Sequence, residues 1–203
     1  SPLRDWSLSI LGALEPTPTK QELEKGNNAV LEFKEFLKKI TDERRKNPGD
    51  PDTDVLTRMI IAEESNLSET ELLQNCIFIL NAGHETTTNL IGNALWALCT
   101  YPMVRKTLIK NPAILNSAID EFLRFLSPNQ FGNRETAFEV SLSGKKIPKN
   151  TNLHLCIGAA NRDPLQFKDP EELIIDRTPN RHLAFAGGAH HCVGFSLAKM
   201  EAR

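Results

Sequence analysis

The chain has 203 residues, of which 40% are hydrophobic and 25% charged, and its formal net charge is −2. This composition is typical of a globular protein with a packed core, and the near-neutral charge argues against a dedicated nucleic-acid-binding protein. No apolar run reaches the length of about eighteen residues that a membrane span needs, and no secretory signal opens the chain. The four cysteines show no C-x-x-C pairing, so we expect reduced thiols in a cytoplasmic protein; a membrane anchor in a segment before Ser1 stays open as the alternative.

The first part of the chain is predicted to be helical. Residues 1–18 are rich in Pro, Leu and Trp and are expected to be irregular. Thr19, with Glu22 three residues later, has the pattern of a capping box. Apolar residues at helical spacing follow, up to a Pro-containing loop over residues 42–51. A short helix is expected over residues 54–62.

The longest predicted helix begins at a second capping box, Ser68 to Glu71, and runs to about Thr100. With a rise of 1.5 Å per residue its length is on the order of 45–50 Å. Because it is apolar over much of its circumference, we expect it to be central in the fold. Two shorter helices are predicted over residues 102–110 and 112–126.

The pattern then changes from helical to mixed. A hairpin is predicted around the turn at residues 143–144, and apolar residues alternate with polar ones over residues 153–157, as in a strand. Residues 161–184 show no period and are expected to form a long ordered loop. The sequence therefore predicts a mainly α fold with a small β component, with a helical part over residues 1–135 and a mixed part over residues 136–203.

The cysteine segment, residues 185–194, places Cys192 among glycines directly ahead of a helix-like run. Glycines allow tight turns and the close approach of a flat ligand, and the start of a helix favours a thiolate over a thiol. A thiolate is the ligand with which a haem iron splits dioxygen. Two alternatives stay open, a buried structural cysteine and a zinc site completed by His182, His190 or His191. Structural zinc usually takes four ligands at regular spacing, which one cysteine and adjacent histidines do not supply.

A polar notch interrupts the longest helix. Glu85 and Thr86 stand side by side between apolar flanks, and His84 separates them from Ala82 and Gly83. A threonine within a helix can bond the carbonyl four residues back and bend the helix, and such a notch can hold a water and pass protons. The alternative is a solvated polar patch. A zinc-protease motif would need a second histidine where Thr88 stands.

Three charged residues and one histidine are further candidates. Glu121 and Arg124 are three residues apart on one predicted helix face and can pair, with apolar neighbours that favour partial burial. Arg134 can hold a carboxylate with its guanidinium fork, and His190 can do so from the cysteine segment. The alternatives are a weak surface salt bridge and a solvated arginine.

Together these segments resemble the cytochrome P-450 superfamily of haem-thiolate monooxygenases. The cysteine segment is similar to the signature F-x-x-G-x-[H/R]-x-C-x-G, the notch to [A/G]-G-x-[D/E]-T and the charged pair to E-x-x-R, in the family's order. Residues 159–164 and 179–182 look like the soluble bacterial branch. The signature positions that match are Phe185, Gly188, His190, Cys192 and Gly194.

The resemblance implies that the chain binds haem b, iron protoporphyrin IX. Cys192 would be the axial ligand of the iron, Arg134 and His190 would pair with the haem propionates, and Phe185 would pack beside the thiolate. The residues implied in cofactor binding are Cys192, His190, Arg134, Phe185, Gly188 and Gly194.

The resemblance also implies a reaction, the insertion of one oxygen atom from dioxygen into a small apolar substrate. Electrons would come from NAD(P)H through a ferredoxin- or flavodoxin-like partner. Glu85 and Thr86 would guide protons as the catalytic residues, and Glu121 and Arg124 would brace the fold behind the haem. The substrate side would be lined by Ala82, Gly83 and a turn at Phe131.

The chain departs from the family pattern at two positions. Ala186 stands where bacterial members usually carry glycine, which is expected to cost little. Glu172 stands where many have an arginine that completes the E-x-x-R network, and Arg177 is the candidate substitute. The chain has no initiator Met, ends at Arg203 without a helix stop signal and covers about half of the family's domain. We therefore expect a partial catalytic domain, with a fragment that binds no haem by itself as the alternative.

Overall fold

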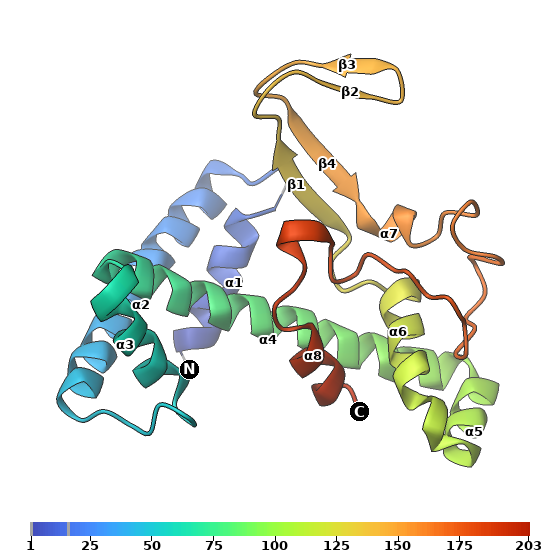
Figure 1. The fold of residues 1–203 in the computed structure, drawn as a ribbon, viewed down its shortest axis with the longest axis horizontal. Coiled ribbons are helices and arrows are strands. Elements are labelled where there is room, and N and C mark those ends of the chain that lie inside the picture. Colours follow the sequence, from blue (N-terminus) through green and yellow to red (C-terminus); the bar gives the residue numbers. More distant parts are fainter. Residues whose placement is uncertain (1, 16) are drawn as a thin grey trace. The chain divides into compact units, whose positions relative to one another are not determined.

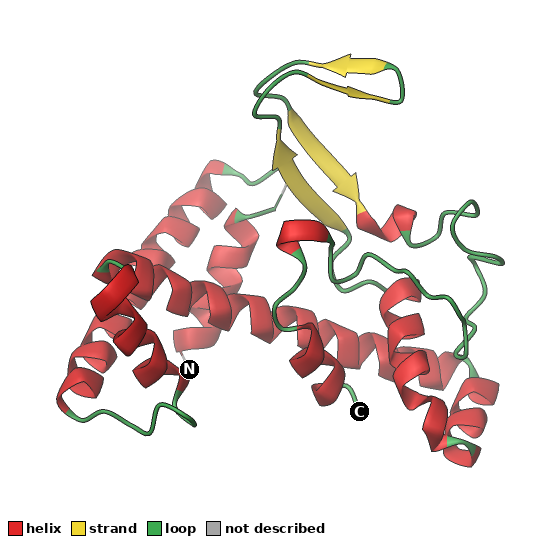
Figure 2. Ribbon diagram, in the orientation of Figure 1, coloured by secondary structure: helices red, strands yellow, loops and turns green. Residues whose placement is uncertain are grey.

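The computed structural model describes residues 2–15 and 17–203, apart from the side chains of residues 63–66. The chain forms two compact units, Ser1–His84 and Glu85–Arg203. Helices dominate both units, and the second also holds two small antiparallel sheets (Figure 1, Figure 2). The expectation of a mainly α fold with a small β component is confirmed.

The expectation of an irregular start is wrong, because α1 spans Pro2–Ala13. Proline is tolerated in the first turn of a helix, where its missing N–H has no partner in any case. Trp6 stacks on Phe33 at a ring-centroid distance of 5.2 Å, and Ile10, one turn further on, is buried. The helix is therefore stabilised by packing against the next helix, which no local signal in residues 1–18 reveals.

The second helix, α2, spans Lys20–Lys46 and begins with the predicted capping box. The Glu22 amide donates to Thr19 Oγ1 at 3.2 Å, and the Thr19 amide donates to Glu22 Oε2 at 2.7 Å. The helix continues past the expected loop start at residue 42, and its last turn carries Arg44, Arg45 and Lys46. Cations at this end interact favourably with the helix dipole.

The core of the first unit joins three helices. The buried residues of this core are Ile10, Ala29, Phe33, Leu37, Leu73 and Ile77. Gly26 of α2 lies so close to Ala13 that a Cβ at this position would overlap the alanine side chain. The missing side chain thus lets α1 approach α2 closely.

The third helix, α3, spans Val55–Asn66 and begins after a polar cluster. Arg44 Nη1 donates to Asp54 Oδ2 at 2.6 Å, and the Thr57 hydroxyl donates to the same oxygen. The bond from Thr57 is the main reason that the pKa of Asp54 lies below its ordinary value. The carboxylate therefore fastens the start of α3 to the end of α2.

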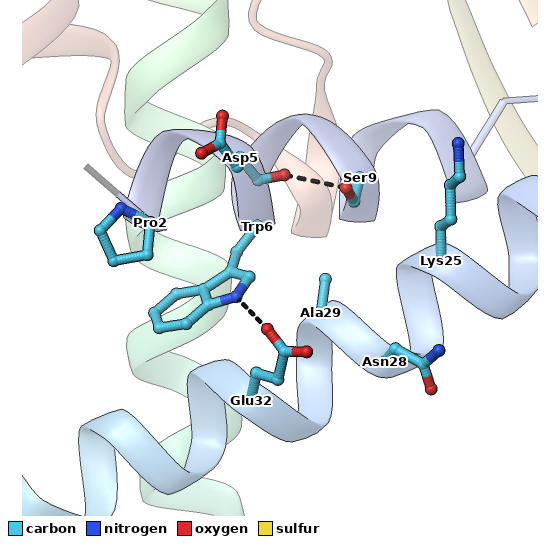
Figure 3. A pocket seen from close by; sticks show the side chains of 8 residues that line it. All are labelled: Pro2, Asp5, Trp6, Ser9, Lys25, Asn28, Ala29 and Glu32. Carbon is cyan, nitrogen blue, oxygen red and sulfur yellow. Dashed lines mark hydrogen bonds between the residues drawn. The ribbon is translucent and has the colours of Figure 1, made fainter.

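A surface groove of about 430 Å³ runs between α1 and α2 (Figure 3). The Trp6 indole donates to Glu32 Oε2 at 2.7 Å, and Ser9 Oγ donates to the Asp5 carbonyl at 2.9 Å. These polar groups of the lining thus bond to one another across and along the groove.

The longest helix, α4, spans Glu69–Thr100, as predicted. Its capping box is formed, since the Ser68 amide donates to Glu71 Oε2 at 2.8 Å and the Glu71 amide to Ser68 Oγ at 3.3 Å. One side of the helix is buried, with Leu72 fully covered, whereas Phe78 is 66% exposed and Leu95 is 58% exposed. The apolar residues of this helix are therefore only partly covered in this chain.

The core of the second unit is built on α6. Helix α5 spans Pro102–Lys110, a short 3₁₀ helix spans Pro112–Ile114 and α6 spans Leu115–Phe125. The buried residues of this core are Leu90, Ala97, Ala118, Ile119, Phe122, Leu123 and Ile175. Helix α6 is short, yet seven of its eight residues from 118 to 125 are buried, all except Asp120. Together with residues of α4 and Ile175 of the long loop, it forms the buried core of this unit.

The sheets differ from the expectation in one strand. Strand β1, Phe131–Glu135, pairs antiparallel with β4, Asn152–Cys156, so that Gly132 lies opposite Leu155. Residues 131–135 were expected in the helical part, and Phe131 in a turn. Few β-branched residues mark this strand, and its partner supplies the pairing. The predicted hairpin is confirmed as β2, Val140–Leu142, and β3, Lys145–Ile147.

The last elements are short and stand at the ends of a long loop. Helix α7 spans Ile157–Ala160, a 3₁₀ helix spans Gly188–His190 and α8 spans Phe195–Glu201. Between α7 and the 3₁₀ helix the chain has no helix or strand, which confirms the ordered loop expected there. Within the part of the chain that the structure describes, no helix is long and apolar enough to cross a membrane.

Candidate functional site

The cysteine segment is a closed loop. The Cys192 amide donates to the Phe185 carbonyl at 2.9 Å, and the Ala186 amide donates to the Leu183 carbonyl at 2.9 Å. Gly188 has a φ of +65°, a conformation that glycine adopts without strain. A Cβ at Gly188 would meet no other atom within 4 Å, so the backbone rather than a side chain faces open space here. The loop thus holds Cys192 where a flat group can approach it.

The Cys192 thiol is exposed, not part of the core. Val193 beside it is 97% exposed, and Leu197 and Met200 of α8 are also exposed. A free cysteine that served only for packing would be covered. The alternative of a buried structural cysteine is therefore not supported. The site has an accessible sulfur next to uncovered apolar side chains.

Two of the three nearby histidines have other partners. His182 lies 3.4 Å from Asp120, and the His191 ring packs edge-on against Phe195 at a centroid distance of 5.1 Å. Among the described residues, no three His, Cys, Asp or Glu side chains converge in a group that could hold a metal. These partners do not support the alternative of a zinc site completed by His182, His190 or His191.

Ala186 is held in a left-handed conformation, with φ at +56°. A side chain at this φ crowds the following carbonyl, which costs about 1–2 kcal/mol relative to the ordinary conformation. The expectation that alanine costs little here is therefore wrong. The loop tolerates the strain because bonds on both sides fix it, from Ala186 to Leu183 and from Cys192 to Phe185.

The polar notch lies on an unbroken stretch of α4. Ala82, Gly83 and Thr86 are exposed, and Glu85 is half-buried. A Cβ at Gly83 would meet no atom within 4 Å, so the backbone is open to approach at this position. Exposed apolar side chains, Ile79 among them, flank the notch. The helix thus presents an acid and a hydroxyl next to apolar surface.

The two predicted propionate partners lie on different elements. Arg134 is in β1, exposed, and its Nη1 donates to the Asn133 carbonyl at 2.7 Å. His190 is exposed in the 3₁₀ helix of the cysteine segment. Among the described residues, no hydrogen bond or ion pair joins either of them to the other or to Cys192. Phe131 is exposed at the start of the same strand.

Glu121 and Arg124 form a buried pair. Arg124 Nε and Nη2 donate to Glu121 Oε2 and Oε1, each at 2.8 Å, and both side chains are 0% exposed. Arg124 also donates to three loop carbonyls, those of Asn161, Pro170 and Glu172, at 2.8–2.9 Å. All of these bonds are charge-assisted, which makes them shorter and stronger than neutral ones. The pair lies inside the unit and not on its surface.

Arg177 supplies the second guanidinium of this network, as expected. Its Nε lies 3.0 Å from Glu121 Oε2 and 3.2 Å from Oε1. The side chain of Glu172 is not needed, because only its carbonyl accepts bonds. The amide of Ile174 and the side chain of Asn180 also donate to Glu121, at 2.8 and 3.0 Å.

Asn161 is a site residue that the sequence analysis did not single out. It is 0% exposed, its Nδ2 donates to Ser127 Oγ at 2.7 Å, and its Oδ1 accepts from the Leu183 amide at 2.7 Å. It thereby connects the end of α6 with the entrance of the cysteine segment. The signal available in the sequence was a polar residue directly after the apolar α7.

The chain is similar to known proteins over almost all of its length. The family model described as "Cytochrome P450" matches residues 7–203. The "Biotin biosynthesis cytochrome P450" of Bacillus subtilis (strain 168) is 34% identical over 202 residues, which are 99% of this chain and 50% of that protein. The "Cytochrome P450 CYP107DY1" of Priestia megaterium is 38% identical over 98% of this chain and 48% of that protein. The chain spans about half the length of the curated relatives it matches.

A solved structure agrees with these matches. The crystal structure of P450BioI in complex with an acyl carrier protein ligated to hexadec-9Z-enoic acid has a TM-score of 0.92 with this chain at 34% identity. The match covers 98% of this chain and 51% of that one.

Replacing Glu121 by glutamine is expected to lower the free energy of unfolding by about 3–5 kcal/mol, because two guanidinium groups lose their buried counter-charge. The matched control is Glu171→Gln, since the carboxylate of Glu171 pairs with Arg162 but is 73% exposed. It should cost less than about 1 kcal/mol. Denaturant unfolding measures both, and equal losses would contradict the difference in burial.

The variant Ala186→Gly is expected to raise the free energy of unfolding by up to about 1 kcal/mol, because it relieves the left-handed strain. The control is Ala189→Gly in the neighbouring 3₁₀ helix, where glycine only adds freedom to the unfolded chain and should destabilise slightly. Thermal unfolding of the two variants should therefore shift in opposite directions. A shift in the same direction would show that Ala186 is not strained.

Proposed function

The chain belongs to the cytochrome P450 family, and on this premise we propose that it is part of a haem-dependent monooxygenase. Such an enzyme inserts one oxygen atom of dioxygen into an apolar organic substrate. The family is one of oxidoreductases, and its members among the relatives include a protein called "6-deoxyerythronolide B hydroxylase" from Saccharopolyspora erythraea. The observation that carries the proposal is the exposed thiol of Cys192 in a loop closed by its own amide bond to Phe185.

The residues of the cysteine segment fit a haem. The only thiol of this segment is accessible, the backbone at Gly187 and Gly188 faces open space, and uncovered apolar side chains lie beside the sulfur. A soft thiolate is a ligand suited to haem iron, and a flat apolar macrocycle would cover the exposed side chain of Val193. A cysteine that was covered by its neighbouring side chains would not be accessible to a haem.

Haem b, when bound, supplies the iron that activates dioxygen, and a thiolate ligand favours cleavage of the O–O bond. In the proposed site Cys192 would be that ligand. The loop bond between the Cys192 amide and the Phe185 carbonyl would fix the sulfur, and the start of α8 behind it would favour its negative charge. Phe185 would pack beside the sulfur, and Gly188 and Gly194 would keep the loop compact.

Arg134 and His190 would pair with the two haem propionates. Arg134 has an exposed guanidinium on β1, and a planar fork suits bidentate binding of a carboxylate. His190 is exposed in the cysteine segment itself. Both groups are thus accessible to a carboxylate, and neither has a carboxylate partner among the described residues.

Glu85 and Thr86 would hold and pass protons on the side of the site where oxygen is activated. An acid and a hydroxyl next to each other on a helix can hold a water and pass a proton through it. Ala82, Gly83 and Phe131 would line the substrate side, with open backbone at Gly83 and an exposed ring at Phe131. Glu121 and Arg124 would brace the fold behind the haem.

Electrons would come from NAD(P)H through a ferredoxin- or flavodoxin-like partner, in the cytoplasm. The substrate would be small and apolar. Two of the similar structures support an apolar substrate: P450BioI was crystallised in complex with hexadec-9Z-enoic acid ligated to acyl carrier protein, and CYP109E1 in complex with testosterone. Residues 1–203 would form part of the catalytic domain.

A second candidate function is a non-catalytic fragment that binds no haem by itself. It is favoured by the exposed apolar side of α4, where Phe78, Leu95 and Trp96 are uncovered, and by a length of about half that of the relatives. The two candidates differ in haem uptake by this chain.

The decisive test is a haem titration of the chain, followed by the absorption spectrum of the reduced carbon monoxide complex. We expect the Soret band of a thiolate-ligated haem, and its complete loss in Cys192→Ala, because the only ligand of the iron on that side is removed. Cys99→Ala and Cys156→Ala are matched controls, since both thiols are exposed as well.

A thiolate spectrum that survives in Cys192→Ala, or that is lost equally in a control, would refute the ligand assignment. No haem uptake by this chain, with normal uptake by a longer polypeptide that contains it, would establish the fragment alternative.

Thr86→Ala is expected to leave the thiolate spectrum intact but to increase the share of electrons lost as hydrogen peroxide severalfold, because the hydroxyl that guides the proton is gone. Thr87→Ala is the control, since it points about 100° away around the same helix. Consumption of NAD(P)H and formation of peroxide, measured together in the reconstituted enzyme, report the ratio. An unchanged ratio in Thr86→Ala would exclude the proton-guiding role.

A further inference from the structure

A cluster of three charged or titratable side chains lies beside the buried network. Lys199 Nζ of α8 is 2.7 Å from Asp120 Oδ1 and 2.8 Å from Oδ2, and His182 Nε2 is 3.4 Å from Oδ1. Burial by itself raises the pKa of the Asp120 carboxyl, but the bonds from His182 and Lys199 together outweigh it and hold the pKa below its ordinary value. Asp120 is thus a charged carboxylate with two partners.

The tautomer of His182 follows from its surroundings. The Ala184 amide donates to His182 Nδ1 at 3.3 Å. Because Nδ1 must then carry a lone pair, the proton of the neutral ring lies on Nε2 and is donated to Asp120. A backbone bond on one side and a carboxylate on the other therefore fix the orientation of this ring.

The two partners of Asp120 flank the cysteine segment on both sides. His182 lies three residues before Phe185, and Lys199 lies five residues after Gly194. The ring of His182 packs on Phe185 at a centroid distance of 5.8 Å, and Phe185 packs edge-on against Phe195 of α8 at 6.2 Å. The Phe185 carbonyl in turn accepts the Cys192 amide. A continuous chain of contacts thus runs from Asp120 to the backbone of Cys192.

The same face of α6 holds the end of α8. Asn116, one turn before Asp120, accepts a bond from Arg203 Nε at 3.1 Å. Residues four apart lie on one side of a helix, so both polar contacts fasten α8 to this one face. The adjacent Glu121 points elsewhere and is fully buried.

We propose that Asp120 is the positioning residue of the cysteine segment. Its carboxylate ties the entrance of the segment, through His182, and its exit, through Lys199, to the rigid helix that also carries the buried network. The part of this inference that concerns the thiolate ligand rests on the proposed function. The contacts of Asp120 with His182 and Lys199 do not depend on haem.

The first arm of the test is hydrogen exchange of the chain without haem. In Asp120→Asn the amides of Ala186 and Cys192 should exchange about tenfold faster, as expected for the loss of a charge-assisted bond that holds the loop. The amide of Leu126, which bonds the Phe122 carbonyl at the end of α6, should keep its rate. Lys199→Met should also accelerate exchange at these two amides, but less, because the contact between His182 and Asp120 remains, and Lys199→Arg should keep the slow exchange.

The matched control is Lys146→Met, which removes a lysine–carboxylate pair with Glu139 near the β2–β3 hairpin. It should leave the exchange of the cysteine segment unchanged. The double variant Asp120→Asn with Lys199→Met should exchange no faster than Asp120→Asn alone, because Asp120→Asn already removes the charge that holds Lys199. Uniform acceleration across the second unit, or none at Ala186 and Cys192, would overturn the positioning role.

The second arm uses the haem-loaded protein. In Asp120→Asn the fraction of the reduced carbon monoxide complex with thiolate ligation should fall severalfold relative to the unchanged protein, and in Lys199→Arg it should not. If the unchanged protein shows no thiolate spectrum, the proposed function fails while the exchange arm still decides the positioning role. If it shows one that Asp120→Asn leaves intact, positioning of the ligand is refuted and the proposed function stands.

Discussion

The structure depends on one carboxylate that has no access to water. Burying an ion without partners costs several kcal/mol, so Glu121 can be charged only where donors surround it. Arg124, Arg177, Asn180 and the Ile174 amide are those donors. Three of them come from residues 174–180, a stretch with no helix or strand. The carboxylate thus fixes the conformation of a loop that lacks the regular backbone hydrogen bonds of a helix or a sheet.

The same helix holds the cysteine segment by two other routes. Asn161 accepts the Leu183 amide and reaches the end of α6 through Ser127, and Asp120 holds both His182 and Lys199. Asp120 and Glu121 are neighbours, yet one is partly exposed and the other fully buried, because successive side chains on a helix point about 100° apart. Helix α6 therefore organises the loop from two faces. We interpret the buried network around Glu121 as a device that selects one arrangement of the loop on α6, more than as a source of net stability.

The remaining site residues stand on three different elements. Cys192 lies in its loop, Arg134 on β1 and Thr86 on α4. Val193, next to Cys192, is uncovered. The apolar ring of the proposed haem would cover such surface, and a haem propionate would give Arg134 a carboxylate partner. The proposed haem therefore accounts for the uncovered apolar side chain and for the exposed guanidinium.

The sequence by itself determined the features that depend on near neighbours. Both capping boxes, the extent of α4 and the β2–β3 hairpin follow from residues a few positions apart, and the motif around Cys192 was readable in the same way. Only the tertiary structure decided what depends on distant partners: the helix at Pro2–Ala13, which Phe33 stabilises, the strand at Phe131–Glu135, which needs β4, and the strain at Ala186. It also decided that Glu121 meets Arg177 across 56 positions. The physical reason is that a cap or a turn is satisfied by atoms of its own segment, whereas a buried charge or an unpaired strand is satisfied only by whatever the fold brings to it.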